Sequence, residues 1–560
     1  MRRTPLALAM VLAAAGLSVS SESATAVALP KGCDPARPAV AHHAGGKALA
    51  EQPADGPIPC GVTTGFGGAE TRIRVTKSGA LIYEPAGIPA GPGGIGFGDG
   101  VPGEVPQTSA SPAGLTVSTD NGATWKLVKP LGVTWGSSDH QGHVDRDTGR
   151  FFWYALHVSG PLPHTNPDAP PPQDQVPGTK AHLLWSADEG KTFTYATACC
   201  PLFSENPRFA TAPAPAGGDK PVGYPNVVYF CANTSIGFTA PVIFGRVCSK
   251  SLNGGTTWSE ESMLFNGLVP THSECDGDGE VYGATDGNYP APASDGSLYV
   301  MVNCNGKTFL AKSTDEAATW PILKDGKGAP LEIPAAEEMR ADPDDNLYLF
   351  KRAGAAITLQ ISRDEGQTWT PEMVVTAPGV ANLDAWFPAV RSAGHVVVSY
   401  YGQRAGQVSY DGYLTESRNA LAAKPVFWSA VVNNPAVPML IDAQGTRAPG
   451  PGFLDYKGAD IGPDGIAWGS YVQDCPPDTS DPVCLDPDGS PRRYGALAFV
   501  GRLAWGLPHP APGSPGARPT QPGGRPLPAT GAADWLAVLA VSVLAVAVVS
   551  RGGRPGRRAR

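Results

Sequence analysis

The stretch SRDEGQTW, residues 362–369, is the clearest of five copies of one eight-residue pattern in this chain. The other copies are STDNGATW from residue 118, SADEGKTF from 186, SLNGGTTW from 251 and STDEAATW from 313. Their consensus is SxDxGxTW, and successive copies start between 49 and 68 residues apart. Repetition at such intervals predicts an array of similar supersecondary units that fold as one body.

The residue types of the repeat are suited to a tight β-hairpin turn that is closed by its own side chains. Asp364 can accept backbone N–H bonds across the turn, Gly366 can adopt a positive φ, and Trp369 can pack back onto the following strand. We therefore interpret the repeat as a structural staple.

On these five copies the chain resembles the Asp-box proteins, also called bacterial neuraminidase repeat proteins, whose best-known members are sialidases. The resemblance covers roughly residues 70–505. It implies an all-β fold, a β-propeller with one Asp box per blade between the two outer strands. In that family the boxes lie away from the active site, so they indicate the fold and not the reaction.

Seven strand-pair units can be traced along residues 70–506, with a repeat copy after each of the first five. A degenerate echo, TESRNALAAKPVFW from residue 415, follows the sixth. Family sialidases have six blades, so six and seven blades are both open, and we favour seven, with YGALAFVGRLAW from 494 as the closing strand. Residues 29–69 are polar and irregular, and we interpret them as a loosely ordered lead-in.

Both ends of the chain carry export signals. Residues 1–28 have two arginines, a short apolar run and small residues, the pattern of a secretory signal peptide. Residues 527–560 contain LPATG, an apolar stretch and an arginine-rich tail, which together resemble a sortase sorting signal. That resemblance implies cleavage between Thr530 and Gly531 and covalent attachment to the peptidoglycan of a Gram-positive cell wall, after a stage in the membrane. An ordinary C-terminal membrane anchor is the alternative, and either way the protein is displayed outside the cell.

Composition narrows the set of partners. Without the signal peptide (net charge +1) and the segment after Thr530 (net charge +4), the net charge of −9 becomes −14, which argues against nucleic acid as a ligand. Residues 507–526 contain seven prolines and predict an extended linker that holds the propeller off the wall. We expect a monomer without a cofactor.

Ten cysteines in an exported chain predict disulfides. Short-range candidate pairs are Cys33 with Cys60, Cys231 with Cys248, Cys275 with Cys304, and Cys475 with Cys484, although spacing alone does not fix the pairing. No spacing resembles a zinc site. Metal binding by His140 and His143, or calcium binding by the acidic residues 276–280, is a less favoured reading than ordinary turns, and we assign no metal site.

The resemblance implies a set of catalytic residues. Sialidases hold the substrate carboxylate with three arginines and use a tyrosine nucleophile, a glutamate base and an aspartate acid. Arg72 in TRIRV is similar to one family arginine, and Glu337 or Glu338 with Arg352 matches the spacing of the base and a second arginine. Tyr456 stands nine residues before a turn glycine, as the family nucleophile does, and Asp99 is a positional candidate for the acid.

The chain also departs from that pattern. Arg74 replaces the proline of the family's FRIP motif, and the third arginine is missing where it is expected, before residue 417. Two functions follow for the propeller mouth, the default ligand site of this fold. One is exo-type cleavage of a terminal sialic acid or related acidic sugar, and the other is non-catalytic binding of glycans or proteins by a surface adhesin.

Overall fold

The structure is a computed structural model, and it describes 29–67, 69–86, 115–128, 137–157, 180–201, 204–236, 242–266, 272–275, 290–440, 458–474 and 496–507. All of these residues belong to one compact unit, Met1–Pro510; a second unit, Ala511–Arg560, lies outside them. The predicted signal peptide, the sorting signal and almost all of the proline-rich linker also lie outside the described residues. Within this part of the chain there is one 3₁₀ turn, Ser273–Cys275, and no α-helix.

Seven antiparallel sheets of four or five strands form the blades of a β-propeller, so the seven-bladed prediction is confirmed. The innermost strands of blades 1 to 7 are β3 (Ala69–Val75), β7 (Ser137–Val144), β11 (Ser204–Ala212), β15 (Ala291–Pro292), β19 (Glu338–Ala341), β23 (Val380–Val390) and β27 (Gly458–Ile461). The second strands are β4 (Leu81–Ala86), β8 (Phe151–His157), β12 (Val227–Ile236), β16 (Leu298–Cys304), β20 (Leu347–Ala353), β24 (Val396–Arg404) and β28 (Ala467–Asp474). The third strands are β5 (Leu115–Ser118), β9 (Lys180–Ser186), β13 (Val242–Ser251), β17 (Lys307–Ser313), β21 (Ala356–Ser362), β25 (Asp411–Ser417) and β29 (Ala496–Ala504). The outermost strands are β6 (Lys126–Val128), β10 (Thr194–Pro201), β14 (Ser262–Asn266), β18 (Glu332–Ile333), β22 (Met373–Val374), β26 (Val426–Val431) and, in blade 7, β2 (Ile58–Gly67).

The N-terminal segment closes the ring, which corrects the prediction of an irregular lead-in over residues 29–69. Strand β2 pairs antiparallel with β29 as the outermost strand of blade 7, and β1 (Val40–His43) adds a fifth strand to blade 6. The expected closing strand is therefore the third strand of blade 7. Gly61 helps to obscure β2 in the sequence, because the backbone there packs too closely for a side chain: a Cβ at Gly61 would lie 2.0 Å from the carbonyl oxygen of Val432.

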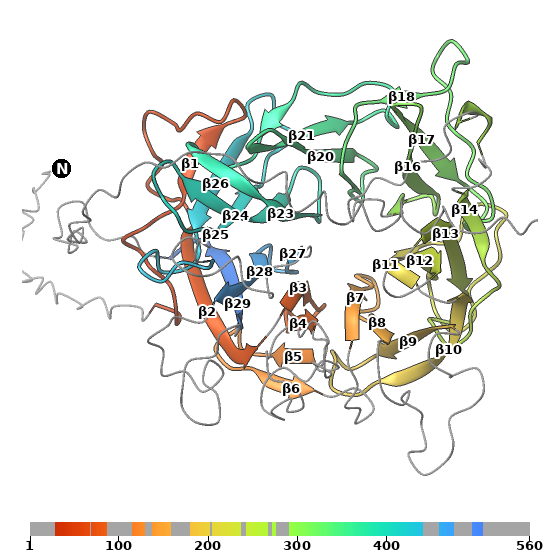
Figure 1. The fold of residues 1–560 in the computed structure, drawn as a ribbon, viewed down its shortest axis with the longest axis horizontal. Coiled ribbons are helices and arrows are strands. Elements are labelled where there is room, and N and C mark those ends of the chain that lie inside the picture. Colours follow the sequence, from red (N-terminus) through yellow and green to blue (C-terminus); the bar gives the residue numbers. More distant parts are fainter. Residues whose placement is uncertain are drawn as a thin grey trace, which may run out of the picture. The chain divides into compact units, whose positions relative to one another are not determined.

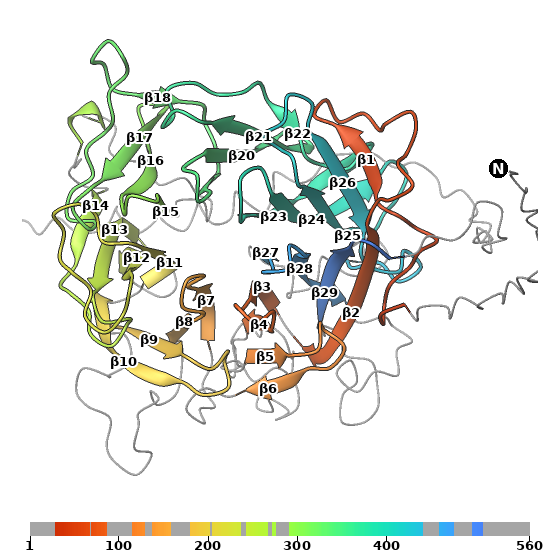
Figure 2. The ribbon, with the colours of Figure 1, turned by 180° about the vertical axis from the view of Figure 1, so that it is seen from behind.

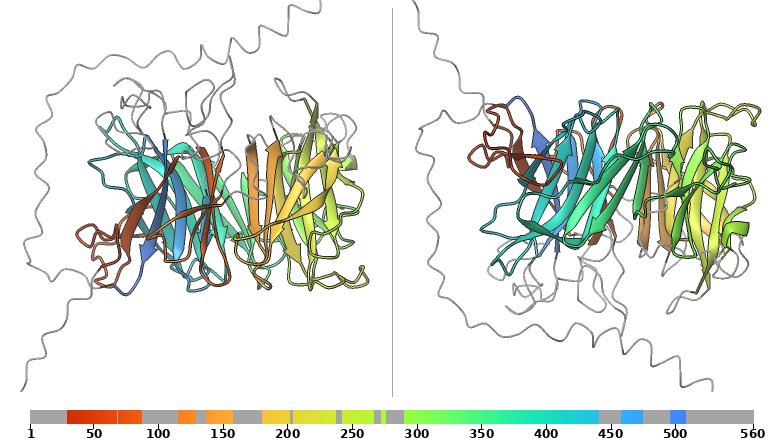
Figure 3. Two further views of the ribbon diagram at one scale, coloured as in Figure 1. Left: turned by 90° about the horizontal axis from the view of Figure 1, so that it is seen from below. Right: turned by 90° about the horizontal axis from the view of Figure 1, so that it is seen from above.

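The innermost strands surround a central channel. Each contacts the innermost strand of the next blade, and β27 of blade 7 contacts β3 of blade 1, so the ring is complete (Figures 1 and 2). Seen from the side, the strands run between two faces of the ring (Figure 3). We call the face where the first strands begin the start face. We call the other the hairpin face, because it carries the turns between first and second strands and, since the blades are antiparallel, those between third and fourth strands.

The hydrophobic core consists of seven clusters, one between each pair of neighbouring blades. Both sides of a middle strand are covered by other blades, and for this reason β16 and β25 are buried almost continuously and do not alternate. The aromatic residue that ends each of the five repeats packs into the cluster shared with the preceding blade. These residues are Trp125, Phe193, Trp258, Trp320 and Trp369.

The repeats form the turns between third and fourth strands in blades 1 to 5. In the fifth copy Ser362 Oγ donates to Asp364 Oδ1 (2.8 Å), and Asp364 accepts the backbone N–H (2.9 Å) and the hydroxyl (2.6 Å) of Thr368. The Gly366 N–H donates to Ser362 Oγ, and φ at Gly366 is 84°. The predicted staple geometry is thus confirmed, except that the tryptophan packs against the preceding blade.

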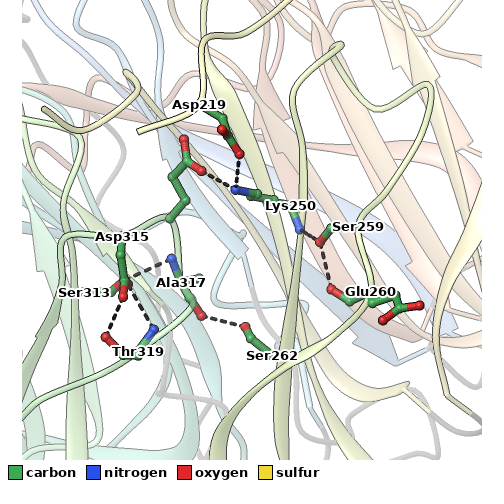
Figure 4. A network of polar contacts seen from close by, with 10 residues as sticks. Asp219, Lys250, Ser259, Glu260, Ser262, Ser313, Asp315, Ala317 and Thr319 are labelled. Atoms are coloured by element: carbon green, nitrogen blue, oxygen red, sulfur yellow. Dashed lines mark hydrogen bonds and ion pairs between the residues drawn. The ribbon is translucent and has the colours of Figure 1, made fainter. Parts of the chain in front are cut away.

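The fourth copy differs because Ala317 occupies the position of the glycine, with φ of 66° next to Glu316 at 59°. Neighbouring blade 3 holds this turn from outside (Figure 4). Lys250 on β13 forms ion pairs with Glu316 and Asp219, and Ser262 Oγ donates to the Ala317 carbonyl at 2.5 Å. These contacts compensate in part for a left-handed backbone conformation that alanine disfavours.

Three of the candidate disulfides are present, Cys33–Cys60, Cys231–Cys248 and Cys275–Cys304. The first joins the N-terminal segment to the closing strand β2, and the second links β12 to β13 across blade 3. The side chains of the other four cysteines lie outside the described part of the chain. None of the described helical segments has the length and apolar character needed to cross a membrane.

Candidate functional site

A cavity of about 460 Å³ lies in the central channel on the hairpin face. Its walls come from all seven blades and, apart from Pro290 just before β15, they are residues of the first strand or of the hairpin that follows it. This volume is within the range of small-molecule sites. Apolar side chains such as Phe209, Met339 and Phe387 make up much of the wall.

Two buried aspartates in the wall have the same surroundings, one in blade 2 and one in blade 5. Asp145 accepts hydrogen bonds from the Tyr224 hydroxyl and the Asn226 amide, and a backbone N–H at residue 147. Asp342 accepts the Tyr348 hydroxyl, the Asn346 amide and backbone N–H groups. Both carboxylates accept several hydrogen bonds from donors of the protein, so they stabilise the hairpins.

Two other groups of the wall, Arg74 and His143, are also held in place. Arg74 Nε donates to the Gly142 carbonyl at 2.6 Å and lies 3.6 Å from the buried Glu84. Burial raises the pKa of Glu84, and the nearby Arg74 opposes this shift. His143 Nε2 bonds to the Thr211 hydroxyl at 3.0 Å, and burial lowers the pKa of His143 to about 4, so its imidazole is neutral at neutral pH.

The predicted base candidates and Arg352 lie together at the start of β19 and the end of β20, toward the start face. The Arg352 backbone N–H donates to the Glu337 carboxylate at 3.3 Å, and the Arg352 side chain is exposed. Glu338 is 5% exposed and forms an ion pair of 2.6 Å with Arg340. The structure therefore brings Glu337 to Arg352 and Glu338 to Arg340.

Arg72 lies in the middle of β3 and is 1% exposed. Its guanidinium is 5.3 Å from the ring centre of Phe387, and Arg340 is 5.1 Å from the same ring. Both distances fit cation–π contact. Arg340 and Phe387 line the cavity whereas Arg72 does not, so the structure brings Arg72 and Arg340 to the same ring.

Four predicted functional residues, Tyr456, Asp99, Thr530 and Gly531, lie outside the described residues. Arg340 and Phe387 are central to the channel and were missed by sequence reasoning. Arg340 stands two residues after Glu338, on the same side of the strand, and this two-residue spacing could have identified Arg340 as a neighbour of Glu338. Within the described ranges no group of three or more His, Cys, Asp or Glu side chains is placed to hold a metal ion, and residues 276–280 are not among them.

Comparisons with known proteins give structural likeness only. No protein-family model and no curated protein matches the chain. Similar solved structures include a protein of unknown function from Dyadobacter fermentans, with 12% identity and a TM-score of 0.37 over 66% of this chain and 95% of that one. The Hadza microbial sialidase Hz136 shares 15% identity, with a TM-score of 0.35 over 69% of this chain and 71% of that one. The NanB sialidase from Streptococcus pneumoniae shares 13% identity, with a TM-score of 0.32 over 81% and 70%. The strand pairing alone establishes the propeller, and these neighbours assign no reaction.

Proposed function

We propose that the protein is a cell-surface propeller that binds a terminal acidic sugar of a glycan at the start face of its channel. The observation that carries this proposal is the exposed side chain of Arg352 at that face, next to Glu337, whose carboxylate accepts the Arg352 backbone N–H. An exposed guanidinium fits a sugar carboxylate through two parallel hydrogen bonds. The repeat turns lie on the other face, as the family resemblance leads us to expect for a site placed here.

The test is binding of sialyllactose against lactose, which lacks the carboxylate. We expect lactose to bind at least tenfold more weakly than sialyllactose, and Arg352→Gln to reduce sialyllactose binding at least tenfold. Lys351→Gln is the matched control, because Lys351 precedes Arg352 on the same strand and pairs with Glu372. Equal binding of the two sugars, or equal losses in both variants, contradicts the proposal.

Hydrolysis of the bound sugar is a second candidate, favoured by the position of Glu337 beside Arg352, the two residues that the sialidase resemblance names as base and carboxylate ligand. In this function Tyr456 is the nucleophile, Glu337 or Glu338 its base and Asp99 the acid. Release of the fluorophore from a fluorogenic sialoside measures it directly. We expect the activity to disappear in Tyr456→Phe, and a wild-type rate no higher than that of the variant from pH 4 to 7 rejects hydrolysis while leaving binding to be judged by sialyllactose.

We further propose export by the signal peptide, cleavage by sortase between Thr530 and Gly531, and attachment to peptidoglycan. The order of LPATG, apolar stretch and arginine-rich tail supports this proposal. Muramidase treatment of cells that express the full chain is expected to release it with wall fragments attached. Release of an unmodified chain by detergent alone is the result expected of an ordinary membrane anchor.

A further inference from the structure

The hairpin-face opening of the channel is bridged by one side chain. Arg146 follows the first strand of blade 2, yet its guanidinium donates to the carbonyls of Val390 (3.1 Å) and Arg391 (3.4 Å) in blade 6. Blades 2 and 6 are not neighbours in the ring, so the side chain extends across the opening, on the rim of the cavity. It is 41% exposed.

A second arginine lies beside it without a carboxylate partner. Arg391 donates one hydrogen bond, to the Ile461 carbonyl at 2.8 Å, and no ion pair of its guanidinium occurs within the described residues. Arg391 and Arg74 are near enough to act electrostatically on Arg146. Like charges held together in this way are unfavourable unless an anion lies between them.

One acidic group of the opening, Asp460, forms an ion pair with Arg146, and within the described residues none forms one with Arg391. Asp460 Oδ1 is 3.6 Å from Arg146 Nη2, and the two Asp460 oxygens already accept the backbone N–H groups of residues 75 and 461. Asp145 and Asp342 accept hydrogen bonds from protein donors, as described above. Asp147 is exposed and accepts a hydrogen bond from Asn226, and it is the remaining acidic residue of the cavity wall.

The two arginines at the opening consequently have N–H donors that the hydrogen bonds described above do not use. A guanidinium has five N–H groups, and the contacts above use two of those of Arg146 and one of those of Arg391. The natural complement is an acceptor with negative charge, and planar guanidinium groups suit carboxylate and sulfate oxygens. The apolar cavity wall below offers room for the body of a small ligand.

We propose that Arg146 and Arg391 form a second ligand site, on the hairpin face, which binds the carboxylate or sulfate group of a small acidic saccharide whose ring enters the channel cavity. This site is separate from the start-face site proposed above and does not depend on it. It also gives a role to the positive charge of the arginine that is held across the opening.

The test is ligand-observed NMR on the full chain with D-glucuronate as the probe and D-glucose as its neutral counterpart. We expect binding of glucuronate, no detectable binding of glucose, and competition by inorganic sulfate. Arg146→Gln and Arg391→Gln are each expected to weaken glucuronate binding at least tenfold. Lys327→Gln removes one positive charge from an exposed loop and is expected to have no effect.

Several results would overturn this site. Equal binding of glucose and glucuronate would show that the carboxylate of the sugar is not recognised, and failure of sulfate to compete would show the same. If both arginine variants bind glucuronate as well as the wild type, and their melting temperatures confirm that they are folded, then Arg146 and Arg391 do not form the site. If Arg352→Gln abolishes glucuronate binding while the Arg146 and Arg391 variants do not, the sugar is bound at the start face and this inference is wrong although the first proposal stands.

Discussion

In blade 5 the turn between β21 and β22 is closed by side chains within eight consecutive residues, whereas the corresponding turn of blade 6 depends on distant segments. The first uses Ser362, Asp364 and Thr368. In the second, Ser417 and Asn419 occupy the places of the serine and aspartate, but Asn419 Oδ1 accepts an N–H seven residues on, from Val426.

The sixth turn is held by Glu416, a fully buried carboxylate. It accepts hydrogen bonds from His395 Nε2 (2.8 Å), Arg418 Nε (2.7 Å) and Trp505 Nε1 (2.8 Å). These partners come from the first hairpin of blade 6, from the turn itself and from the residue after the last strand. The outer turn of a propeller blade can thus be closed by a local motif that is visible in the sequence, or by long-range contacts that are not. We expect a mutation to lower the free energy of unfolding by different amounts in the two cases.

The largest effect is expected for Glu416→Gln. The substitution keeps the size of the side chain but removes the charge that three donors share, and it replaces one of the two accepting oxygens by an N–H₂ group, which cannot accept a hydrogen bond. Loss of one partner from a buried ionic network costs about 3–5 kcal/mol in the free energy of unfolding. Chemical denaturation of the purified protein measures the change.

The matched control is Glu365→Gln in the fifth turn. Glu365 is exposed and lies 3.3 Å from Lys312, and an exposed pair of this kind contributes about 0–1 kcal/mol. Similar losses in the two variants would show that the sixth turn is no more dependent on its carboxylate than a repeat turn.

A smaller effect is expected for Asp364→Ala, which removes three local hydrogen bonds but leaves no fully buried charge. We expect a loss of about 1–2 kcal/mol by the same measurement. Asp364→Asn is the control, because the third copy already has Asn253 at this position with the bonds to Ser251 and Thr257 intact. A loss in the asparagine variant as large as in the alanine variant would mean that the charge, and not the hydrogen-bond geometry, holds the turn.

This contrast also explains how far the sequence carried the prediction. The five repeats can be recognised in the sequence because the residues that close each turn are close together in the chain. Together with the strand pairs between them, they predict the seven blades. Strands β1 and β2 were not predicted because their partners are hundreds of residues away, and Gly61 of β2 is required by close packing against Val432 and not by any local pattern.

The candidate sites were harder to predict for the same reason. Glu337 and Arg352 meet because Glu337 lies just before β19 and Arg352 lies near the end of its partner strand β20, and their spacing in the sequence indicates this. The contact of Arg72 and Arg340 with Phe387 joins blades 1, 5 and 6, and Arg146 reaches Arg391 across the channel. Such contacts depend on closure of the ring, which no stretch of sequence displays.

A gain of stability is expected for Ala317→Gly in the fourth turn. Glycine adopts the left-handed conformation of this position without the Cβ penalty, and after allowance for its more flexible unfolded state we expect a gain of about 0.5–1 kcal/mol. Gly366→Ala is the opposite change at the same position of the fifth turn, where a Cβ would also lie 2.6 Å from Leu310. If Ala317→Gly instead destabilises the protein, the contacts from blade 3 depend on the methyl group.

The smallest effect is a local difference in acid sensitivity between the first and third turns. Hydrogen bonds from the Thr124 hydroxyl and N–H lower the pKa of Asp120 to about 2, and the corresponding residue of the third turn is Asn253, which does not titrate. A carboxyl whose pKa is lower in the folded state than its usual value of 3.8 stabilises the fold above that pH, and this contribution is lost as the pH falls from 3.8 toward 2.

Amide hydrogen exchange, expressed as protection relative to the unfolded chain, distinguishes the two turns. Between pH 4 and pH 2 we expect the amide of Thr124 to lose protection while that of Thr257 keeps it. The change should stay within the turn, because Asp120 is exposed and its bonds are all local. Equal loss at both threonines would mean that acid opens the blades cooperatively, and that local staples contribute little to the order in which the propeller unfolds.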